Sequence, residues 1–162
     1  MAIEAPISKF KKTNLKIYIV VCIAAAVIFA YDGYLSKYRW SMRYQFFKKN
    51  VLDNDGKPTS TMNFNRKSPP FFIGAAALLS LYLFAIRNKK IIADENELII
   101  SDKERIPYGS IQKIDKTHFD PTKGYFIVTY KNKDEGEISR KISSKTYDNL
   151  TVILDELVAK IS

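Results

Sequence analysis

The histidine is the first residue to examine for chemistry, because imidazole has an ordinary pKa that suits proton transfer near neutral pH. The chain has one, His118, in the sequence KTHFDP, with Asp115 and Asp120 nearby. A Ser–His–Asp triad also needs a nucleophile on a sharp turn, and the sequence has no G-x-S-x-G motif. We therefore expect His118 to be structural or exposed to solvent, and the protein to have no catalytic residue.

A metal or cofactor site is not expected either. The single cysteine, Cys22, lies inside an apolar segment, and one histidine with one cysteine cannot supply the ligands of a zinc site. The sequence has no P-loop and no G-x-G-x-x-G motif, so it indicates no nucleotide cofactor and no small-molecule substrate. Proteins that bind other molecules without transforming them remain as the expected class.

The net charge of +9 is unevenly distributed along the chain. Residues 1–16 carry four lysines and one glutamate, and residues 32–70 carry eight basic and three acidic residues. Residues 87–162 are nearly balanced, with fourteen basic and thirteen acidic residues. Because a nucleic-acid-binding domain needs a basic face, we expect no nucleic acid partner. The basic residues flank two apolar segments, which indicates the anionic surface of a lipid bilayer as a partner.

Two uncharged apolar segments predict a pair of transmembrane helices. They are IYIVVCIAAAVIFAY at 17–31 and FFIGAAALLSLYLFAI at 71–86, and with their flanks they give predicted spans at 15–35 and 70–87. A soluble two-helix core is an alternative, but neither segment has a polar side to face water. A cleaved signal peptide is an alternative for the first segment, although no A-x-A site follows its apolar core.

Small residues along each span predict close packing of the two helices as an antiparallel hairpin. The predicted helix-packing residues are Cys22, Ala26 and Ala30 in the first span, and Gly74, Ala77 and Ser80 in the second. The apolar runs contain no charged residue, so we expect no ion or proton pathway through this chain alone.

The segment between the spans, residues 36–69, is expected to begin as a continuation of the first helix. From the end of the first span onward, aromatic and aliphatic residues recur at steps of three or four, which predicts a helical stripe with its aromatic residues at the membrane surface. The stripe comprises Tyr31, Leu35, Tyr38, Met42 and Phe46. The second half of the segment has the composition of an irregular loop. The residues expected at the membrane interface are Tyr34, Tyr38, Trp40, Tyr44 and Arg87.

Residues 1–14 are predicted to form a basic N-terminal tail, and residues 88–162 a soluble domain. In the soluble domain, short runs with a period of two predict an antiparallel sheet of five or six strands, with a hairpin turn at residues 132–136. Near the C-terminus, apolar residues at helical spacing predict one helix that caps the sheet and buries Leu154 and Leu157. The predicted fold is therefore a membrane α-hairpin joined to an α+β domain.

The order of these elements resembles the bacterial PH-like domains that are appended to transmembrane segments in many membrane proteins. The resemblance rests on the runs IADENELIIS, RIPYGSIQKI and GYFIVTY, and the element from Ile106 to Ile114 carries it most clearly. It implies an antiparallel sheet or partial barrel capped by a C-terminal helix. Because the domain is short for such a barrel, either an incomplete barrel or an added partner strand is expected. The resemblance implies a binding or scaffolding module and does not imply phosphoinositide recognition.

We expect a membrane-anchored, non-catalytic interaction or scaffold protein that docks a protein partner at the membrane surface or forms a homo-oligomer. The alternative is an accessory subunit of a larger membrane protein complex. The expected location is the bacterial inner (cytoplasmic) membrane, with a multi-pass topology and the C-terminal domain in the cytoplasm. The basic segment between the spans favours the opposite orientation.

Overall fold

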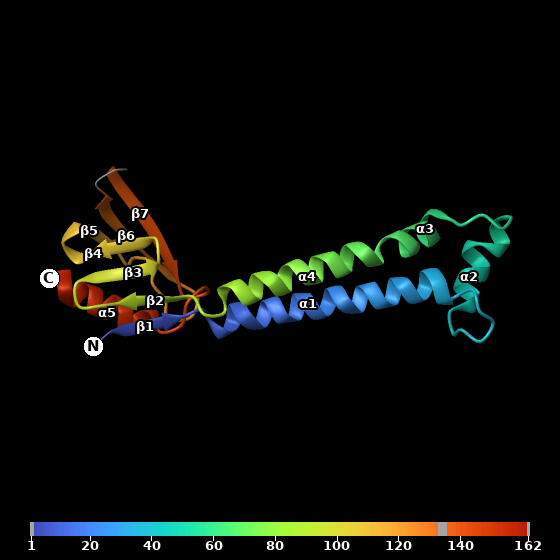
Figure 1. The fold of residues 1–162 in the computed structure, drawn as a ribbon, viewed down its shortest axis with the longest axis horizontal. Coiled ribbons are helices and arrows are strands. Elements are labelled where there is room, and N and C mark those ends of the chain that lie inside the picture. Colours follow the sequence, from blue (N-terminus) through green and yellow to red (C-terminus); the bar gives the residue numbers. More distant parts are fainter. Residues whose placement is uncertain (1, 133–135, 162) are drawn as a thin grey trace. The chain divides into compact units, whose positions relative to one another are not determined.

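The structure, a computed structural model, describes residues 2–132 and 136–161 of the chain (Figure 1). It is an α+β protein with two sheets of antiparallel strands and a C-terminal helix. The chain separates into two compact units. The sheet unit consists of Met1–Thr13 and Ala85–Ser162, and the helical unit of Asn14–Phe84.

The helical unit is built on two long helices, α1 and α4, which run side by side in opposite directions (Figure 1). Its elements are α1 at Lys9–Ala30, a π-helical turn η1 at Tyr31–Leu35, α2 at Tyr44–Asn50, a 3-10 turn η2 at Leu52–Asn54, α3 at Ser60–Lys67 and α4 at Pro69–Ile86. Pro69 and Pro70 occupy the first turn of α4, where a missing N–H costs no helical hydrogen bond.

Aromatic and small side chains hold α1 and α4 together. The Phe29 ring of α1 lies 5.4 Å, between centroids, from the Phe72 ring of α4. It lies at the same distance from the Phe64 ring of α3, the helix that precedes α4. Ala26 and Ala76 are both buried. Ala26 precedes Phe29 by about one turn and Ala76 follows Phe72 by about one turn, so in an antiparallel pair the two alanines lie at the same level. Their small side chains allow the two backbones to approach closely there.

The predicted continuation of the first helix through the aromatic segment is wrong. Residues 36–43 form a succession of turns, and regular helix resumes only at Tyr44. The physical reason is that the side chain of Arg43 turns back to the carboxylate of Asp32, which closes the intervening residues into a loop.

The sheet unit contains a four-stranded sheet of order β1-β2-β3-β4 and a three-stranded sheet of order β5-β6-β7, where the sequence predicted one sheet of five or six strands. The strands are β1 at Ile3–Pro6, β2 at Lys90–Ala93, β3 at Glu97–Ser101, β4 at Glu104–Pro107, β5 at Ile111–Asp115, β6 at Tyr125–Asn132 and β7 at Gly136–Ser143. A 3-10 turn, η3 at Tyr108–Ser110, connects the two sheets. The sequence predicted β2 to β7 but not β1.

Strand β1 lies within residues 1–14, for which the sequence predicts a basic tail. It pairs with β2 from Ile3, opposite Ala93, to Pro6, opposite Lys90. Ala5 has no exposed surface, so this strand is part of the core. The sequence feature that could have predicted this strand is the alternation of apolar and polar residues in IEAPI. The proline in this run would restrict such a strand to the edge of a sheet. The helical hairpin is thus inserted between two neighbouring strands of one sheet.

Helix α5, Leu150–Ile161, packs its apolar face on this core. Leu154 and Leu157 are 5% and 0% exposed, which confirms their predicted burial. The predicted hairpin turn lies outside the described residues at 133–135, while β6 and β7 pair on either side of it up to Asn132 and Gly136.

Candidate functional site

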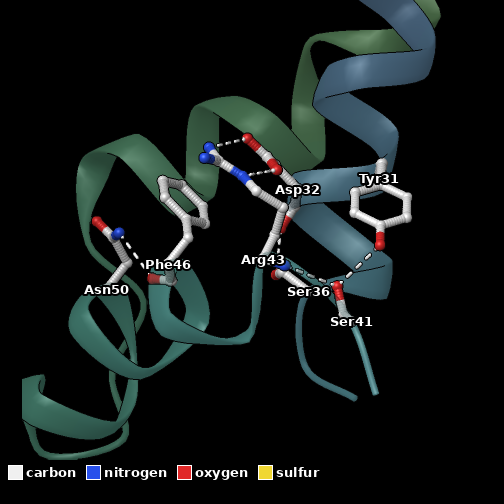
Figure 2. A network of polar contacts seen from close by, with 7 residues as sticks. All are labelled: Tyr31, Asp32, Ser36, Ser41, Arg43, Phe46 and Asn50. Carbon is white, nitrogen blue, oxygen red and sulfur yellow. Dashed lines mark hydrogen bonds and ion pairs between the residues drawn. The ribbon is translucent and has the colours of Figure 1, made fainter. Parts of the chain in front are cut away.

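A group of buried polar side chains lies where α1 ends in the helical unit (Figure 2). We call it the tip clasp, and its members are Tyr31, Asp32, Ser36, Ser41 and Arg43. Asp32, Ser36 and Ser41 are at most 6% exposed. Buried polar groups of this kind must find hydrogen-bond partners inside the protein.

The centre of the tip clasp is a bidentate ion pair. Nε and Nη2 of Arg43 each donate a hydrogen bond of 2.8 Å to one oxygen of the Asp32 carboxylate. The Asp32 side chain is 8% exposed and that of Arg43 is 51% exposed. The hydrogen bond to Asp32, followed by its charge, raises the pKa of Arg43 above its ordinary value. Both carboxylate oxygens are engaged, so the pair stabilises a structure and does not present Asp32 as a general base.

Serine hydroxyls complete the tip clasp. Ser36 Oγ donates to the backbone carbonyl of Asp32, and the Ser36 N–H donates to the Tyr31 carbonyl at 3.0 Å, the i to i+5 bond of the π-helical turn. Ser41 Oγ donates to the Tyr31 hydroxyl at 3.1 Å and accepts from the Arg43 N–H at 3.2 Å. These bonds hold residues 36–43 in place although they form no regular helix (Figure 2).

The turn η1 also packs directly on the backbone of α3. A Cβ placed on Gly33 would lie 2.8 Å from the carbonyl oxygen of Asn65, closer than real contacts allow, so glycine is required there. Arg66 Nε donates to the Gly33 carbonyl at 3.1 Å, and the Tyr34 hydroxyl donates to the Arg66 carbonyl at 2.7 Å. The end of α1 is therefore fixed by the tip clasp and by α3.

The loop closed by the tip clasp carries large side chains exposed to solvent. Trp40 and Met42 are 70% and 93% exposed. The rings of Tyr38 and Trp40 stack with their centroids 5.6 Å apart, and Lys37 Nζ lies 5.1 Å from the Tyr38 centroid. Amphipathic aromatic rings beside cations are the residues that membrane–water interfaces favour.

The structure brings most of the predicted membrane-interface residues into this region of the helical unit. Tyr34, Tyr38 and Trp40 are exposed there, and Tyr44 is half-buried with its ring 6.4 Å from that of Phe47. Arg87 directly follows α4 and belongs to the sheet unit, so it is not part of the same group.

The predicted helix-packing residues lie only partly on buried sides of the helices. In α1, Ala26 is buried and Cys22 and Ala30 are half-buried. In α4 the predicted residues are all exposed: Gly74, Ala77 and Ser80. A Cβ placed on Gly74 would meet nothing within 4 Å, and the buried face of α4 carries Ala76 instead. Because α4 consists almost wholly of apolar and small residues, its sequence did not distinguish this face from the others.

The structure does not assemble His118 and its neighbouring aspartates into one site. His118 is exposed. Asp115 and Asp120 accept hydrogen bonds from Thr117 and Thr122 in their own turns, and these bonds are the main cause of the lowered pKa of each aspartate. Among the residues that the structure describes, no group of three His, Cys, Asp or Glu side chains is placed to hold a metal ion.

The sheet unit has polar contacts that tie its parts together. Glu104 accepts hydrogen bonds from the Tyr130 hydroxyl at 3.0 Å and from Arg140 Nε, which links β4 to β6 and β7. The Tyr108 hydroxyl donates to the Asp94 carbonyl at 2.7 Å. Burial, followed by the charges of nearby carboxylates, raises the pKa of Tyr108 to about 12.

The start of α1 is capped by a distant part of the sheet unit. Ser8, which has no exposed surface, accepts a hydrogen bond at its Oγ from the Lys11 N–H at 3.1 Å and donates to the Lys145 carbonyl at 2.7 Å. The Lys9 N–H donates to the carboxylate of Asp148 at 3.0 Å. The point where the chain leaves β1 for α1 is therefore part of the folded sheet unit.

Sequence reasoning missed the residues that organise the end of α1. In the sequence, Asp32 is an acidic residue directly after an apolar run, and Arg43 is one of eight basic residues in 32–70. A carboxylate next to an apolar helix costs free energy unless it has a partner. Asp32 is therefore the residue from which an ion pair could have been predicted. Its partner, 11 residues along the chain, follows no fixed helical spacing and was not predictable from the sequence.

No protein-family model, curated protein or solved structure matches the chain. The class of protein is therefore defined by its architecture: an α+β protein with two antiparallel sheets, in which two long apolar helices are inserted between adjacent strands.

Proposed function

We propose that this chain is an integral membrane protein whose helical hairpin crosses a bilayer twice and anchors a non-catalytic interaction domain. The observation that carries the proposal is the exposure of the apolar helices. Two helical stretches, Lys9–Leu35 and Ser60–Ile86, are long and apolar enough to cross a membrane. In the most apolar 18-residue segment of each, only 6% and 17%, respectively, is buried. An apolar helix with so little protein around it needs a lipid environment or other apolar helices.

This exposure disfavours the two other interpretations of the apolar segments. The core helices of a soluble protein are covered by the rest of the fold, and these helices are not. A signal peptide is cleaved off during export, and its removal here would delete β1 with its buried residue Ala5.

The attachment of the sheet unit to the hairpin supports a scaffolding role. Both ends of the hairpin enter the same sheet unit, because β1 precedes α1 and β2 follows α4. The two strands pair, and the Ile7 N–H continues the ladder with a hydrogen bond of 3.1 Å to the Lys89 carbonyl. A domain that is held at two points has less freedom to move away from its anchor than a domain on one linker.

We further propose that the sheet unit is a PH-like partial barrel that docks a protein partner or a second copy of the chain. The four-stranded and three-stranded antiparallel sheets and the single helix α5 support this proposal. Strand β1 of the same chain adds a fourth strand to one of these sheets, beside the strands that the sequence predicted.

An accessory subunit of a larger membrane complex is the second candidate. The exposed apolar side chains of α1 and α4 favour this second candidate. The helices of another subunit would cover these side chains just as well as lipid would. The exposed residues include Ile17, Val20, Val27, Phe71, Leu78 and Leu81.

Membrane fractionation followed by gentle detergent extraction, native gels and mass spectrometry tests both candidates. We expect the full chain in the bacterial inner membrane, resistant to alkaline carbonate, and present as a monomer, a homo-oligomer or a complex with one defined partner. A large stable assembly of several membrane subunits would favour the accessory role. Recovery of the chain in the soluble fraction would overturn the proposed function.

A reporter fusion tests the orientation, for which we propose a cytoplasmic sheet unit. Alkaline phosphatase is active only in the periplasm and green fluorescent protein fluoresces only in the cytoplasm, so a fusion after Ser162 should fluoresce and show no phosphatase activity. The matched fusion inserts each reporter after Asp55, at an exposed turn between η2 and α3, and should show phosphatase activity and no fluorescence. The same result for both fusions would contradict a hairpin that crosses the membrane twice.

A further inference from the structure

A cleft of about 610 Å³ lies beside the residues that follow α4. It begins at Ala85, in the last turn of α4, and extends along β2 and β3 to the turn at Lys103. Three lysines and three isoleucines are among the residues that line it, and we call it the lysine cleft. All of its lining residues belong to the sheet unit.

The floor of the lysine cleft is apolar where a polar surface is expected. Ile91 and Ala93 of β2 are buried in the core, so the alternation of side chains along a strand places Ile92 on the opposite face of the sheet. Ile92 pairs with Ile99 of β3, and both are half-buried. The outer face of an antiparallel sheet normally carries polar residues. This isoleucine pair therefore indicates a ligand or surface that is partly apolar.

The rim of the lysine cleft is basic. It includes Lys89, Lys90 and Lys103, with Asp102 as the acidic lining residue. Lys90 forms an ion pair with Glu4. Within the described part of the chain, neither Lys89 nor Lys103 has an ion pair, so two of the lysines that line the cleft have no carboxylate partner. This arrangement complements an amphiphile with a negatively charged head.

We propose that the lysine cleft binds the headgroup of an anionic phospholipid. The phosphate lies at Lys89 and Lys103, and the first carbons of the acyl chains cover Ile92 and Ile99. Continuity with α4 supports this occupant, because the cleft begins in the last turn of the apolar helix, where the headgroups of a bilayer would lie. Basic pockets next to membrane spans are suited to anionic headgroups. The inference rests on the proposed membrane location.

Purified full-length protein in a neutral detergent tests the inference. Its thermal unfolding midpoint is measured during titration with dioctanoyl phosphatidylglycerol, dioctanoyl phosphatidylcholine or glycerol 1-phosphate, and native mass spectrometry counts the bound lipids. A ligand that binds the folded state raises the midpoint. We expect phosphatidylglycerol to raise it and to remain bound as one molecule, while phosphatidylcholine and glycerol 1-phosphate leave it unchanged at the same concentration.

Two variants and a matched control locate the site. Lys103→Glu should weaken binding of phosphatidylglycerol about tenfold through loss of a charge-assisted contact. Ile99→Gln should also weaken it, because it alters the floor and leaves every lysine in place. Lys116→Glu makes the same charge change at an exposed position outside the cleft and should bind as the unaltered protein does. For each variant, the midpoint with ligand is compared with the midpoint of the same variant without ligand. This comparison separates an effect on binding from an effect on folding.

Besides a failure of phosphatidylglycerol to bind, three results would overturn the inference. They are an equal response to phosphatidylcholine, an equal response to glycerol 1-phosphate, which would assign the cleft to a soluble phosphate, and an equal loss of binding in Lys116→Glu. If the chain fractionates with membranes but phosphatidylglycerol fails to bind, the lipid site is refuted and the proposed function stands. If the chain is soluble in cells, the proposed function itself fails.

Discussion

The backbone N–H of Lys9 and the carboxylate of Asp148 are joined by a hydrogen bond of 3.0 Å, although 139 residues separate them in the sequence. Asp148 lies just before α5, and its own N–H donates to the Pro6 carbonyl at 2.9 Å. A carboxylate at a helix N-terminus satisfies a free N–H and interacts favourably with the helix dipole. The first turn of α1 is thus fixed by residues near the opposite end of the chain.

Replacing Asp148 tests this cap. Asp148→Ala should lower the free energy of unfolding by about 1 kcal/mol, the usual cost of losing a capping side chain. Chemical denaturation of the full chain in detergent, followed by circular dichroism, measures the change. Asp155→Ala removes an exposed carboxylate from α5 and should have little effect. Equal effects of the two variants would contradict a role for Asp148 in capping α1.

The ion pair of the tip clasp can be tested by a conservative change. Arg43→Lys keeps the charge but loses the bidentate geometry, and should destabilise the loop by about 1–3 kcal/mol because Asp32 is buried while Arg43 is half-exposed. Chymotrypsin should then cut faster after Tyr38 and Trp40 in the intact protein. Arg39→Lys, in the same loop, is the matched control. An unchanged cleavage rate in Arg43→Lys would show that the ion pair does not hold the loop.

Two glycines in the helical unit should respond in opposite ways to alanine. Gly33→Ala places a Cβ 2.8 Å from the Asn65 carbonyl, and should destabilise the helical unit by about 1–3 kcal/mol. Gly74→Ala meets nothing within 4 Å and should be neutral or slightly stabilising, because alanine favours helix by about 0.5–1 kcal/mol over glycine. Thermal unfolding in detergent gives both values. A stable Gly33→Ala protein would refute the close approach of η1 and α3.

Helix α5 provides a test of the sheet core. Leu157 has no exposed surface, so Leu157→Ala should cost about 2–5 kcal/mol, as for other core leucines. Val152 lies on the same helix with 49% of its surface exposed, and Val152→Ala should cost much less. Denaturant unfolding measures both variants. A similar small loss in each would mean that α5 does not pack on the sheets as the structure has it.

Tyr108 predicts a loss of stability in alkaline solution. Its pKa rises from 10.0 to about 12 in the folded protein, mainly because of burial. Below pH 10 both folded and unfolded chains keep the proton, so its contribution to stability is complete. Between pH 10 and about 12 the unfolded chain releases the proton first, and the stability falls. Tyr108→Phe should flatten this part of the pH dependence, measured by denaturant unfolding. An unchanged slope would contradict the prediction.

The sequence predicted the elements whose signals are local. The apolar run at 17–31 and the period-two pattern of β6 each identify their element without knowledge of the remaining chain. Strand β1 was missed because its partner, β2, lies beyond the whole hairpin, and four residues carry too little periodicity to predict a strand alone. The side chains of the tip clasp were missed for a related reason. The pairing of Asp32 with Arg43 depends on how a loop closes, and neither residue type nor spacing determines that.

The insertion of the hairpin between β1 and β2 also sets the order in which the hairpin and the four-stranded sheet form during synthesis and folding. Glu4 is synthesised early and its ion-pair partner Lys90 comes 86 residues later, so the first strand waits unpaired until both apolar helices have been made. The entropy of bringing such distant segments together is reduced once α1 and α4 lie side by side, because the hairpin returns the chain to the strand from which it left. The four-stranded sheet can therefore be completed only after the hairpin has formed. A chain in which α1 and α4 fail to pair retains an exposed strand edge, which cellular proteases and chaperones recognise.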